Sequence, residues 1–479
     1  MDDMQKIEVP SGDTKEVMQQ RFDRMHALTR SGVAPTFEER RDRLDRLRQM
    51  LVQNEDAFIK AISDDFCHRS PHESRLLDIT LTLNSLRNAR KHLRRWMRDE
   101  SRHVDLAFQP AKDWVRYEPL GVIGIISPWN YPLFLALGPL VDALAAGNRA
   151  MIKPSELTPR TSALLAEKIA ESFDETEVTV ITGDAEIAAA FSRLPFDHLV
   201  FTGSTAVGRK VAEAAAPNLT PVTLELGGKS PVILCDDYPL QDAARSIAFG
   251  KYLNAGQTCI SPDYALVPRA KLDEFAQAVI AEARAKYPTL AQNPDYTSIV
   301  SPRHHARLTG AIEEARAGGA TVLSLEDDGT AQFRKIPPTV VIDAPEDSLL
   351  LREEIFGPIL PVIAYDTLDE VAKYINARDR PLALYAFSKD SAQLEGILDR
   401  SISGGVTLNG TMLHAAQEGM AFGGVGASGM GGYHGRDGFR RFSHARSVHK
   451  VGFLNAFEKL GPPWGTLAER VTGFLAKRR

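Results

Sequence analysis

Hydrophobic and polar positions follow a helical period near the start of the chain. Thr36-Phe37-Glu38-Glu39 predicts a capping box, in which the Thr36 hydroxyl and the Glu39 carboxylate satisfy backbone N–H groups of a new helix. The apolar side chains that follow share one helical face: Leu44, Leu47, Leu51, Phe58 and Ile62. Charged helical sequence continues to about residue 98, and we expect these helices to pack as a layer on another element.

Between residues 101 and 119 the pattern changes to alternation on both sides of a break at Pro110. The alternating side chains are Val104, Leu106, Phe108, Trp114, Arg116 and Tyr117. This pattern predicts a β-hairpin, and a hairpin between domains is a natural subunit contact.

Beyond residue 120, short and wholly apolar runs alternate with amphipathic helices at residues 159–173 and 185–194. The predicted strands are residues 121–127, 149–153, 177–182, 198–202 and 222–226. Strands that are apolar on both faces and alternate with helices form parallel sheets, so the fold class is α/β with a Rossmann-type domain. A second such series runs from residue 231 to about residue 408 and predicts a second α/β domain.

Composition agrees with a globular enzyme and excludes several other classes. The 479 residues exceed one hydrophobic core, and 57 Lys and Arg against 62 Asp and Glu leave a net charge of −5. That balance lacks the excess of positive charge that is typical of nucleic-acid-binding proteins. A basic cluster near the C-terminus is interpreted as a solvated or subunit-interface face, with an acidic partner as the alternative: Arg436, Arg440, Arg441, Arg446 and Lys450.

The chain also shows no export signal. Three scattered cysteines are too few for a disulfide framework or a zinc site. The first ten residues, MDDMQKIEVP, lack the apolar run of a signal peptide, and we find no apolar run of membrane length. We therefore expect a cytoplasmic protein.

Two residues have catalytic potential: Cys259 follows a glycine-containing turn, and Glu225 ends an apolar strand. Cys259 ends the segment Asn-Ala-Gly-Gln-Thr-Cys, where small neighbours let backbone N–H groups approach a ligand on its sulfur. Cys67 and Cys235 are expected to be packing residues. Glu225 ends an apolar strand before two glycines, so a raised pKa would suit a general base; pairing with Lys229 is the alternative.

Other motifs predict binding sites for an oxyanion and for a nucleotide. Asn130, in Pro-Trp-Asn-Tyr-Pro after the first parallel strand, can donate to an oxyanion or act as a turn residue. Gly203 and Ser204 join a strand to a helix N-terminus that can face a pyrophosphate. Lys153 and Glu156 end another strand and can hold ribose hydroxyls, and a carboxylate there favours NAD over NADP.

Taken together, these motifs resemble the aldehyde dehydrogenase superfamily from about residue 41 to residue 450. PWNYP, KPSE, FTGSTAVG, LELGGK, GQTC, EEIFGP and FGG occur in the family's order, and Glu225 precedes Cys259 by 34 residues. The wording CISPDY and GASGMGGYHGRDGF is similar to the class 3-like branch and its bacterial coniferyl aldehyde dehydrogenases. Ala421 stands where a proline usually precedes Phe-Gly-Gly, which weakens the transfer of substrate preference.

The resemblance implies oxidation of an aldehyde to its acid through a thiohemiacetal and a thioester on Cys259. The Asn130 amide and the Cys259 N–H would hold the oxyanion, and Glu225 would activate water. The implied cofactor, NAD with NADP as the alternative, would be held by Lys153, Glu156, Gly203, Ser204, Gly208, Glu354 and Phe356. Tyr131 and Phe422 would line the aldehyde tunnel.

The resemblance also implies an organisation and leaves alternatives. Residues 1–100 would be the helical part of the cofactor domain, 101–119 the oligomerisation hairpin, 120–227 the NAD-binding domain and 228–425 the catalytic domain, with 426–479 returning to the cofactor domain of a homodimer. Coniferyl aldehyde or a related aromatic aldehyde is the expected substrate, with medium- or long-chain aldehydes as the alternative. A CoA-acylating dehydrogenase, a cofactor-free acyl hydrolase and a non-catalytic binding protein are the competing interpretations.

Overall fold

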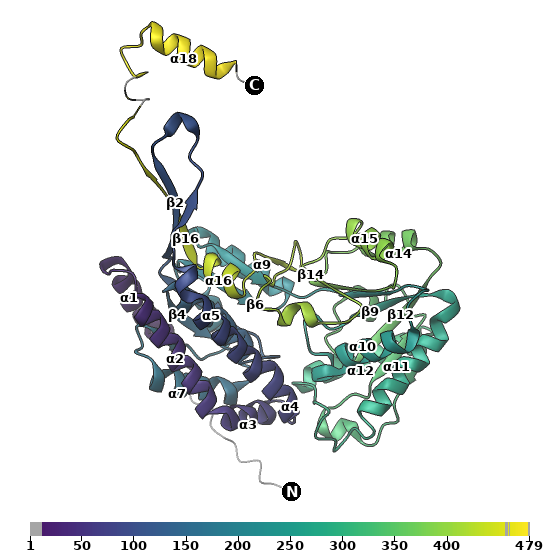
Figure 1. The fold of residues 1–479 in the computed structure, drawn as a ribbon. Helices are drawn as coiled ribbons and strands as arrows, with labels where there is room; N and C mark the ends of the chain where they lie inside the picture. Colours follow the sequence, from purple (N-terminus) through teal and green to yellow (C-terminus); the bar gives the residue numbers. More distant parts are fainter. Residues whose placement is uncertain (1–11, 456–457, 459, 478–479) are drawn as a thin grey trace.

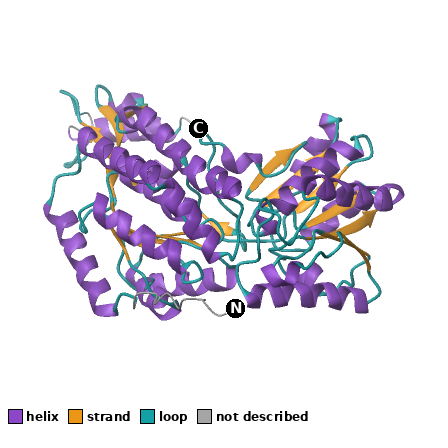
Figure 2. Ribbon diagram, turned by 90° about the horizontal axis from the view of Figure 1, so that it is seen from below, coloured by secondary structure: helices purple, strands orange, loops and turns teal. Residues whose placement is uncertain are grey.

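A computed structural model describes residues 12–455, 458 and 460–477 of the chain. The N-terminal stretch on which the absence of a signal peptide was predicted lies outside these residues. Two α/β bodies stand side by side, and a narrow arm rises from the first of them (Figure 1). In both bodies the strands lie between helices (Figure 2), as an α/β fold requires.

The first body contains a six-stranded sheet whose order is β15-β7-β6-β3-β4-β5. Its members are β3 (Val122–Ile126), β4 (Arg149–Lys153), β5 (Val178–Val180), β6 (His198–Thr202), β7 (Val222–Glu225) and β15 (Gly429–Met430). All pairs are parallel except β15 with β7. The five apolar runs predicted as strands form β3 to β7. The strand order reverses between β3 and β6, which opens a crevice at their carboxyl ends.

Helices cover both faces of this sheet because the strands are apolar on both sides. One core joins the sheet to α2 (Phe37–Gln53), α3 (Glu55–Asp65), α5 (Leu81–Trp96), α6 (Phe134–Ala146) and α7 (Pro159–Ser172). On the other face a smaller core contains α1 (Lys15–Ser31), α8 (Ala185–Phe191) and α9 (Thr205–Ala215). The predicted helical layer is therefore present.

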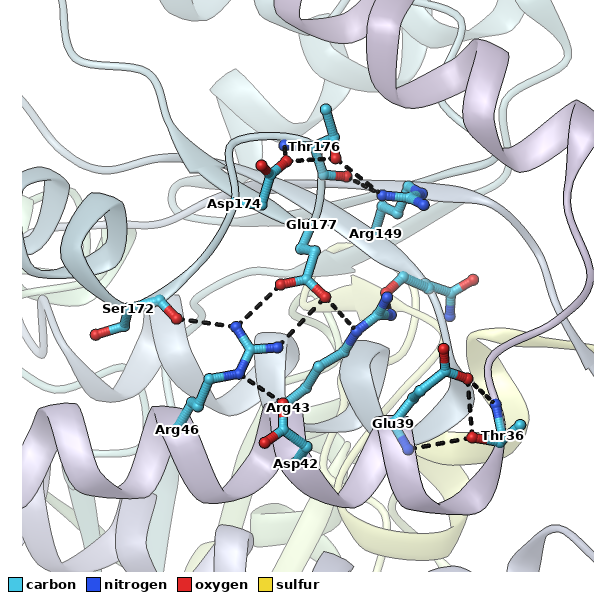
Figure 3. Close-up of polar contacts among 11 residues, drawn as sticks. Thr36, Glu39, Asp42, Arg43, Arg46, Arg149, Ser172, Asp174, Thr176 and Glu177 are labelled. Carbon is cyan, nitrogen blue, oxygen red and sulfur yellow. Dashed lines mark hydrogen bonds and ion pairs between the residues drawn. The ribbon is translucent and has the colours of Figure 1, made fainter.

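Helix α2 is fixed at the amino end of the sheet by a partly buried ion-pair cluster (Figure 3). The predicted capping box is confirmed: the Thr36 N–H donates to Glu39 at 2.7 Å, and the Glu39 N–H donates to the Thr36 hydroxyl at 3.2 Å. One turn later, Arg43 and Arg46 donate to the Glu177 carboxylate at 3.0 and 2.9 Å. Because Glu177 directly precedes β5, the cluster ties α2 to the sheet edge opposite the crevice.

The second body contains a seven-stranded sheet of order β10-β11-β12-β9-β8-β13-β14, parallel except for β10. Its strands are β8 (Pro231–Leu234), β9 (Tyr264–Pro268), β10 (Thr321–Ser324), β11 (Thr339–Ile342), β12 (Ile359–Tyr365), β13 (Ala383–Phe387) and β14 (Gly405–Leu408). Helices α10 (Leu240–Tyr252), α11 (Leu272–Lys286) and α12 (Pro302–Ala317) pack in its main core. Helices α14 (Leu368–Asn376) and α15 (Ser391–Asp399) pack in a smaller one.

The arm is a three-stranded antiparallel sheet, β1 (Glu100–Arg102), β2 (Lys112–Pro119) and β16 (Ser443–Lys450). The predicted hairpin is present as β1 and β2, but its first strand ends at Arg102, and Leu106–Phe108 form a 3-10 turn. The alternation there did not mark a buried face, since Leu106 is exposed. Over the described residues, no helix combines the length and apolar character needed to cross a membrane.

Candidate active site

A cavity of about 1390 Å³ opens at the carboxyl edge of the first sheet, and the second body forms its opposite wall. Of the residues predicted from the sequence, those that line it are Asn130, Lys153, Glu156, Gly203, Ser204, Glu225, Cys259, Glu354 and Phe356. They come from the ends of β4 and β7 and the loops after β3, β4 and β6 in the first body, and from two loops of the second. Segments far apart in the sequence thus meet at one site.

Cys259 follows a turn with an unusual backbone. After α10 the chain passes through Asn254 and Ala255 at φ of 51° and 50° and then Gly256 at φ of 72°. A Cβ at Gly256 would lie 2.2 Å from the Gly357 carbonyl oxygen, so only glycine fits at this position. The tight turn brings the Cys259 backbone and sulfur to the cavity wall.

The side chain of Gln257 holds this turn in place through hydrogen bonds. This side chain is fully buried and donates to the Ser298 carbonyl oxygen, while its own oxygen accepts from the Val300 N–H, each at 3.0 Å. The buried hydrogen bonds restrict the conformations open to the residues on either side, Cys259 included.

The surroundings of Cys259 favour its neutral thiol over the thiolate. Burial raises its pKa to about 12, and the nearby carboxylates of Glu354 and Glu225 add to the shift. A thiol becomes a nucleophile only as the thiolate, so its activation requires a positive charge or a proton acceptor.

Glu225 can be such an acceptor. It is 2% exposed, and neither carboxylate oxygen has a hydrogen-bond partner among the described residues. Burial raises its pKa well above the ordinary value, which makes it a stronger base. The alternative pairing with Lys229 is not formed, because Lys229 donates to Asp263 instead.

Asn130 brings an amide to the turn that carries Cys259. Its side chain is 3% exposed, and Nδ2 donates to the Gln257 carbonyl oxygen at 3.1 Å. An amide nitrogen carries two hydrogens, so one remains for an oxygen bound near the sulfur. The neighbouring Trp129 packs edge-on against Phe356 and His304.

The far end of the cavity holds the residues predicted for ribose and pyrophosphate. Lys153 is 1% exposed, and Nζ donates to the Pro154 carbonyl at 2.7 Å and lies 3.9 Å from the half-exposed Glu156 carboxylate. Burial lowers the pKa of Lys153. Gly203 follows β6, and Ser204 caps α9, so the N-terminus of this helix points into the cavity.

Glu354 approaches the backbone at Gly227. A Cβ on Gly227 would lie 2.0 Å from a Glu354 carboxylate oxygen, so the missing side chain makes room for this group. Burial raises the pKa of Glu354 to about 8.

The polar atoms around the cavity fit a dinucleotide. The buried oxygens without a hydrogen-bond partner in the described chain include Ser127 Oγ, Thr202 Oγ1, both Glu225 oxygens and Glu354 Oε1. A cavity of this size, with a helix N-terminus at one end and a thiol at the other, matches a ligand that has phosphates, ribose hydroxyls and a reactive ring.

Three predicted site residues do not line this cavity. Gly208 lies inside α9, where a Cβ would approach Leu226 to 2.6 Å, so it permits close helix packing. Tyr131 is buried and hydrogen-bonds the Thr258 hydroxyl. Phe422 is stacked between His414 and His434 at centroid distances of 6.3 and 5.6 Å.

Sequence reasoning missed several residues of the cavity wall, among them His304 and Arg307 of α12. Arg307 donates to the carbonyl oxygens of Ile355 and Glu354 at 2.9 and 2.7 Å and so fixes the loop that carries Glu354. No local motif surrounds these residues, and only the fold brings them to the site. Trp129 stood inside a motif that had been singled out and could have been included.

Comparison with known proteins gives a consistent result. Residues 5–448 match the aldehyde dehydrogenase family. A Pseudomonas aeruginosa protein named "Probable coniferyl aldehyde dehydrogenase" is 48% identical over 94% of each chain. The substrate-bound AldH structure from Staphylococcus aureus superimposes with a TM-score of 0.91, 36% identity and coverage of 97% of this chain and 100% of that one. A Mycobacterium tuberculosis aldehyde dehydrogenase complexed with NAD+ gives 0.83 and 29%, over 93% and 92%.

Proposed function

The chain belongs to the aldehyde dehydrogenase family, and we propose that it uses NAD+ to oxidise coniferyl aldehyde or a related aromatic aldehyde to the acid. The observation that carries the proposal is that Cys259 and Glu225 open on the same cavity as Lys153, Glu156 and the N-terminus of α9. A nucleophile, a base and a dinucleotide-shaped site are thereby combined.

In the first step Cys259 attacks the aldehyde carbon. Its proton passes to a carboxylate of the cavity, which we assign to Glu225, and the C–S bond forms as the carbonyl π electrons move to oxygen. The resulting oxyanion accepts from the Asn130 amide and the Cys259 N–H. Loss of one such donor typically costs about 3–4 kcal/mol of barrier.

Bound NAD+ supplies the hydride acceptor that turns the thiohemiacetal into a thioester. Lys153 and Glu156 would hold the adenosine ribose, Gly203 and Ser204 the pyrophosphate, and Glu354 with Phe356 the nicotinamide ribose. Gly208 contributes by letting α9 approach β7 closely.

Glu225 acts again in the last step. After it has released the thiol proton to solvent, it takes a proton from water, whose oxygen attacks the thioester carbon. The C–S bond then breaks, and the departing Cys259 thiolate takes that proton from Glu225 as the acid is released. This base distinguishes the proposal from a CoA-acylating dehydrogenase, which needs no activated water. The nucleotide cavity distinguishes it from a hydrolase.

The carboxylate of Glu156 favours NAD+ over NADP+. In this role a carboxylate accepts from a ribose 2′-hydroxyl and repels a 2′-phosphate. NADP+ is the alternative cofactor, since Glu156 is half-exposed and can turn away.

The aromatic substrate rests on the coniferyl-type relative. Tyr131 and Phe422 remain the positions proposed for aldehyde contact, although neither lines the cavity described above. Aliphatic aldehydes of medium or long chain are the alternative. Steady-state rates with coniferyl aldehyde, benzaldehyde and hexanal decide between them, and a more than tenfold preference for hexanal would contradict the aromatic assignment.

Replacement of single cysteines by serine tests the reaction itself. We expect Cys259→Ser to lower NADH formation by at least about a thousandfold, because a serine hydroxyl is a far weaker nucleophile here. Cys67→Ser, a change at an exposed cysteine outside the cavity, is the control and should keep full activity. Undiminished acid and NADH from Cys259→Ser would refute the mechanism.

For the assembly and the compartment, we propose a homodimer formed through the arm and action in the cytoplasm. The arm extends away from the two bodies (Figure 1). Exposed apolar side chains on or beside it are Leu106, Val451 and Phe453. All three cysteines are free thiols, as a reducing compartment requires.

A further inference from the structure

A short segment outside the cavity, residues 69–78, carries buried charged side chains that contact both loops of the proposed oxyanion site. Arg69 lies between α3 and α4 (Pro71–Ser74), Glu73 is in α4, and Asp78 is in the π-helical turn that follows. Arg69 and Asp78 are fully buried, and Glu73 is 6% exposed. None of these charges lines the cavity described above.

Arg69 holds the loop that carries Asn130. One guanidinium nitrogen donates to the Asn130 backbone carbonyl at 2.9 Å, and another lies 3.1 Å from the Asp78 carboxylate. The guanidinium also lies 5.0 Å from the centre of the Tyr131 ring. The Asp78 carboxylate in turn accepts from the N–H groups of Leu133 and Phe134, at the start of α6, each at 3.1 Å.

Glu73 holds the turn that carries Cys259. Its carboxylate accepts from the Asn254 N–H at 2.8 Å and from the Thr297 hydroxyl. Asn254 is one of the left-handed residues of that turn, a conformation that needs outside support in a residue other than glycine.

The contacts of Arg69 and of Glu73, which together form a brace for the two loops, meet at one atom, the Asn130 carbonyl oxygen. Asn254 Nδ2 donates to the Asn130 carbonyl oxygen at 3.3 Å, the same oxygen that receives Arg69, and to the Gln257 carbonyl oxygen at 3.2 Å. The Asn130 side chain also donates to Gln257. Displacing Arg69 would therefore move the Asn130 amide relative to the backbone two residues before Cys259.

We propose that Arg69 and Glu73 are positioning residues that set the separation between the Asn130 amide and the Cys259 N–H. The proposal rests on the function proposed above, in which these two groups hold the oxyanion. Buried ion pairs stabilise folds weakly, since desolvation offsets most of their attraction. Their value here is geometric, because a misplacement of about 1 Å at a reacting group can cost about a hundredfold in rate.

The test is a double-mutant cycle between Arg69→Met and Asn130→Ala, with Arg69→Lys as the variant that keeps a buried cation beside Asp78. A lysine ammonium cannot reach Asp78 and the Asn130 carbonyl with separate nitrogens, so it restores the charge without the bridge. The readouts are the rate of the first NADH turnover, the Kd of NAD+ and the melting temperature.

We expect both Arg69 variants to slow the first turnover at least about tenfold while the Kd of NAD+ changes less than about twofold. In the Asn130→Ala background the same changes should cost almost nothing further, since the group they position is gone. Equal losses in both backgrounds, or full activity of a folded Arg69→Lys enzyme, would overturn the proposal.

Arg43→Met is the matched control. Arg43 is a buried arginine paired with a carboxylate, Glu177, at the opposite end of the same sheet (Figure 3). It should lower the melting temperature as Arg69→Met does and leave the first turnover unchanged. Should the unaltered protein form no NADH from NAD+ and aldehyde, the proposed function would fail, whereas failure of the brace would leave normal turnover in the Arg69 variants.

Discussion

Cys259 lies in a setting that disfavours its thiolate. Burial and two carboxylates raise the pKa of its thiol to about 12, so the thiolate fraction at neutral pH is very small. A positively charged ring in the cavity would reverse part of this shift. Oxidation and alkylation act on thiolates, so we expect both to be slow at Cys259 in the free enzyme.

The reactivity of Cys259 in the free enzyme should therefore rise steeply with pH. Below its pKa the thiolate fraction increases about tenfold per pH unit, so alkylation by iodoacetamide should accelerate without a plateau up to pH 9. Mass spectrometry of the Cys259 peptide measures this rate separately from that of the exposed Cys67. A plateau below pH 8 would show that the thiol is already ionised.

Glu225 is costly to the fold in its charged form. Its pKa in the folded state is raised above the ordinary value of 4.5, so the folded state loses stability relative to the unfolded chain as pH rises from about 4.5 toward the folded pKa. Glu225→Gln removes that cost. We expect the free energy of unfolding to increase by about 1–3 kcal/mol at pH 8 and by less at pH 5.

The same variant should lose turnover, because no base remains to activate water. The NADH of the first turnover should form more slowly, because the Cys259 thiol has lost its proton acceptor, and the enzyme should then stall as the thioester after one NADH per site. Stopped-flow absorbance and thermal unfolding at the two pH values measure both effects. A variant that is less stable at pH 8 than the original, or that turns over normally, would contradict this account.

In the loop that follows β7, one backbone position determines where the Glu354 carboxylate of the second body can lie. Gly227→Ala would place a Cβ 2.0 Å from the present position of the Glu354 carboxylate, which must then move. We expect the Kd of NAD+ to rise about tenfold, the loss of one charge-assisted hydrogen bond. Gly310→Ala in α12, where a Cβ meets nothing within 4 Å, is the control and should bind NAD+ normally. Titration of protein fluorescence with NAD+ compares the two.

Elements and motifs were predictable wherever the signal was local. Strands β3 to β7 are continuous apolar runs; the loops with Asn130 and Gly203 follow two of them, and Glu225 is the last residue of β7. The brace around Arg69 could not be predicted, because a buried charge has no sequence pattern and its partners are distant in the chain. For the same reason the pairing of β16 with β2 was missed.

The site also depends on how the whole molecule is assembled. The amide of Asn130 belongs to the first body and the thiol of Cys259 to the second, and their cavity exists only where the bodies meet. Contacts such as that of Glu73 with Asn254 cross this junction and hold it. Relative movement of the bodies would therefore alter catalysis before it altered either sheet.

The arm gives the last prediction, which concerns the assembled enzyme. Leu106 is 78% and Phe453 is 96% exposed, and burying such side chains in a partner contributes about 1.5–3 kcal/mol each. Leu106→Asp with Phe453→Asp should therefore raise the dimer Kd at least about tenfold, because each aspartate would be buried without a partner. Val52→Asp, a change at an exposed apolar residue of α2, is the control and should leave the dimer intact. Sedimentation velocity over a range of concentrations measures the shift. Unaltered chains that sediment as monomers at every concentration would refute the proposed dimer.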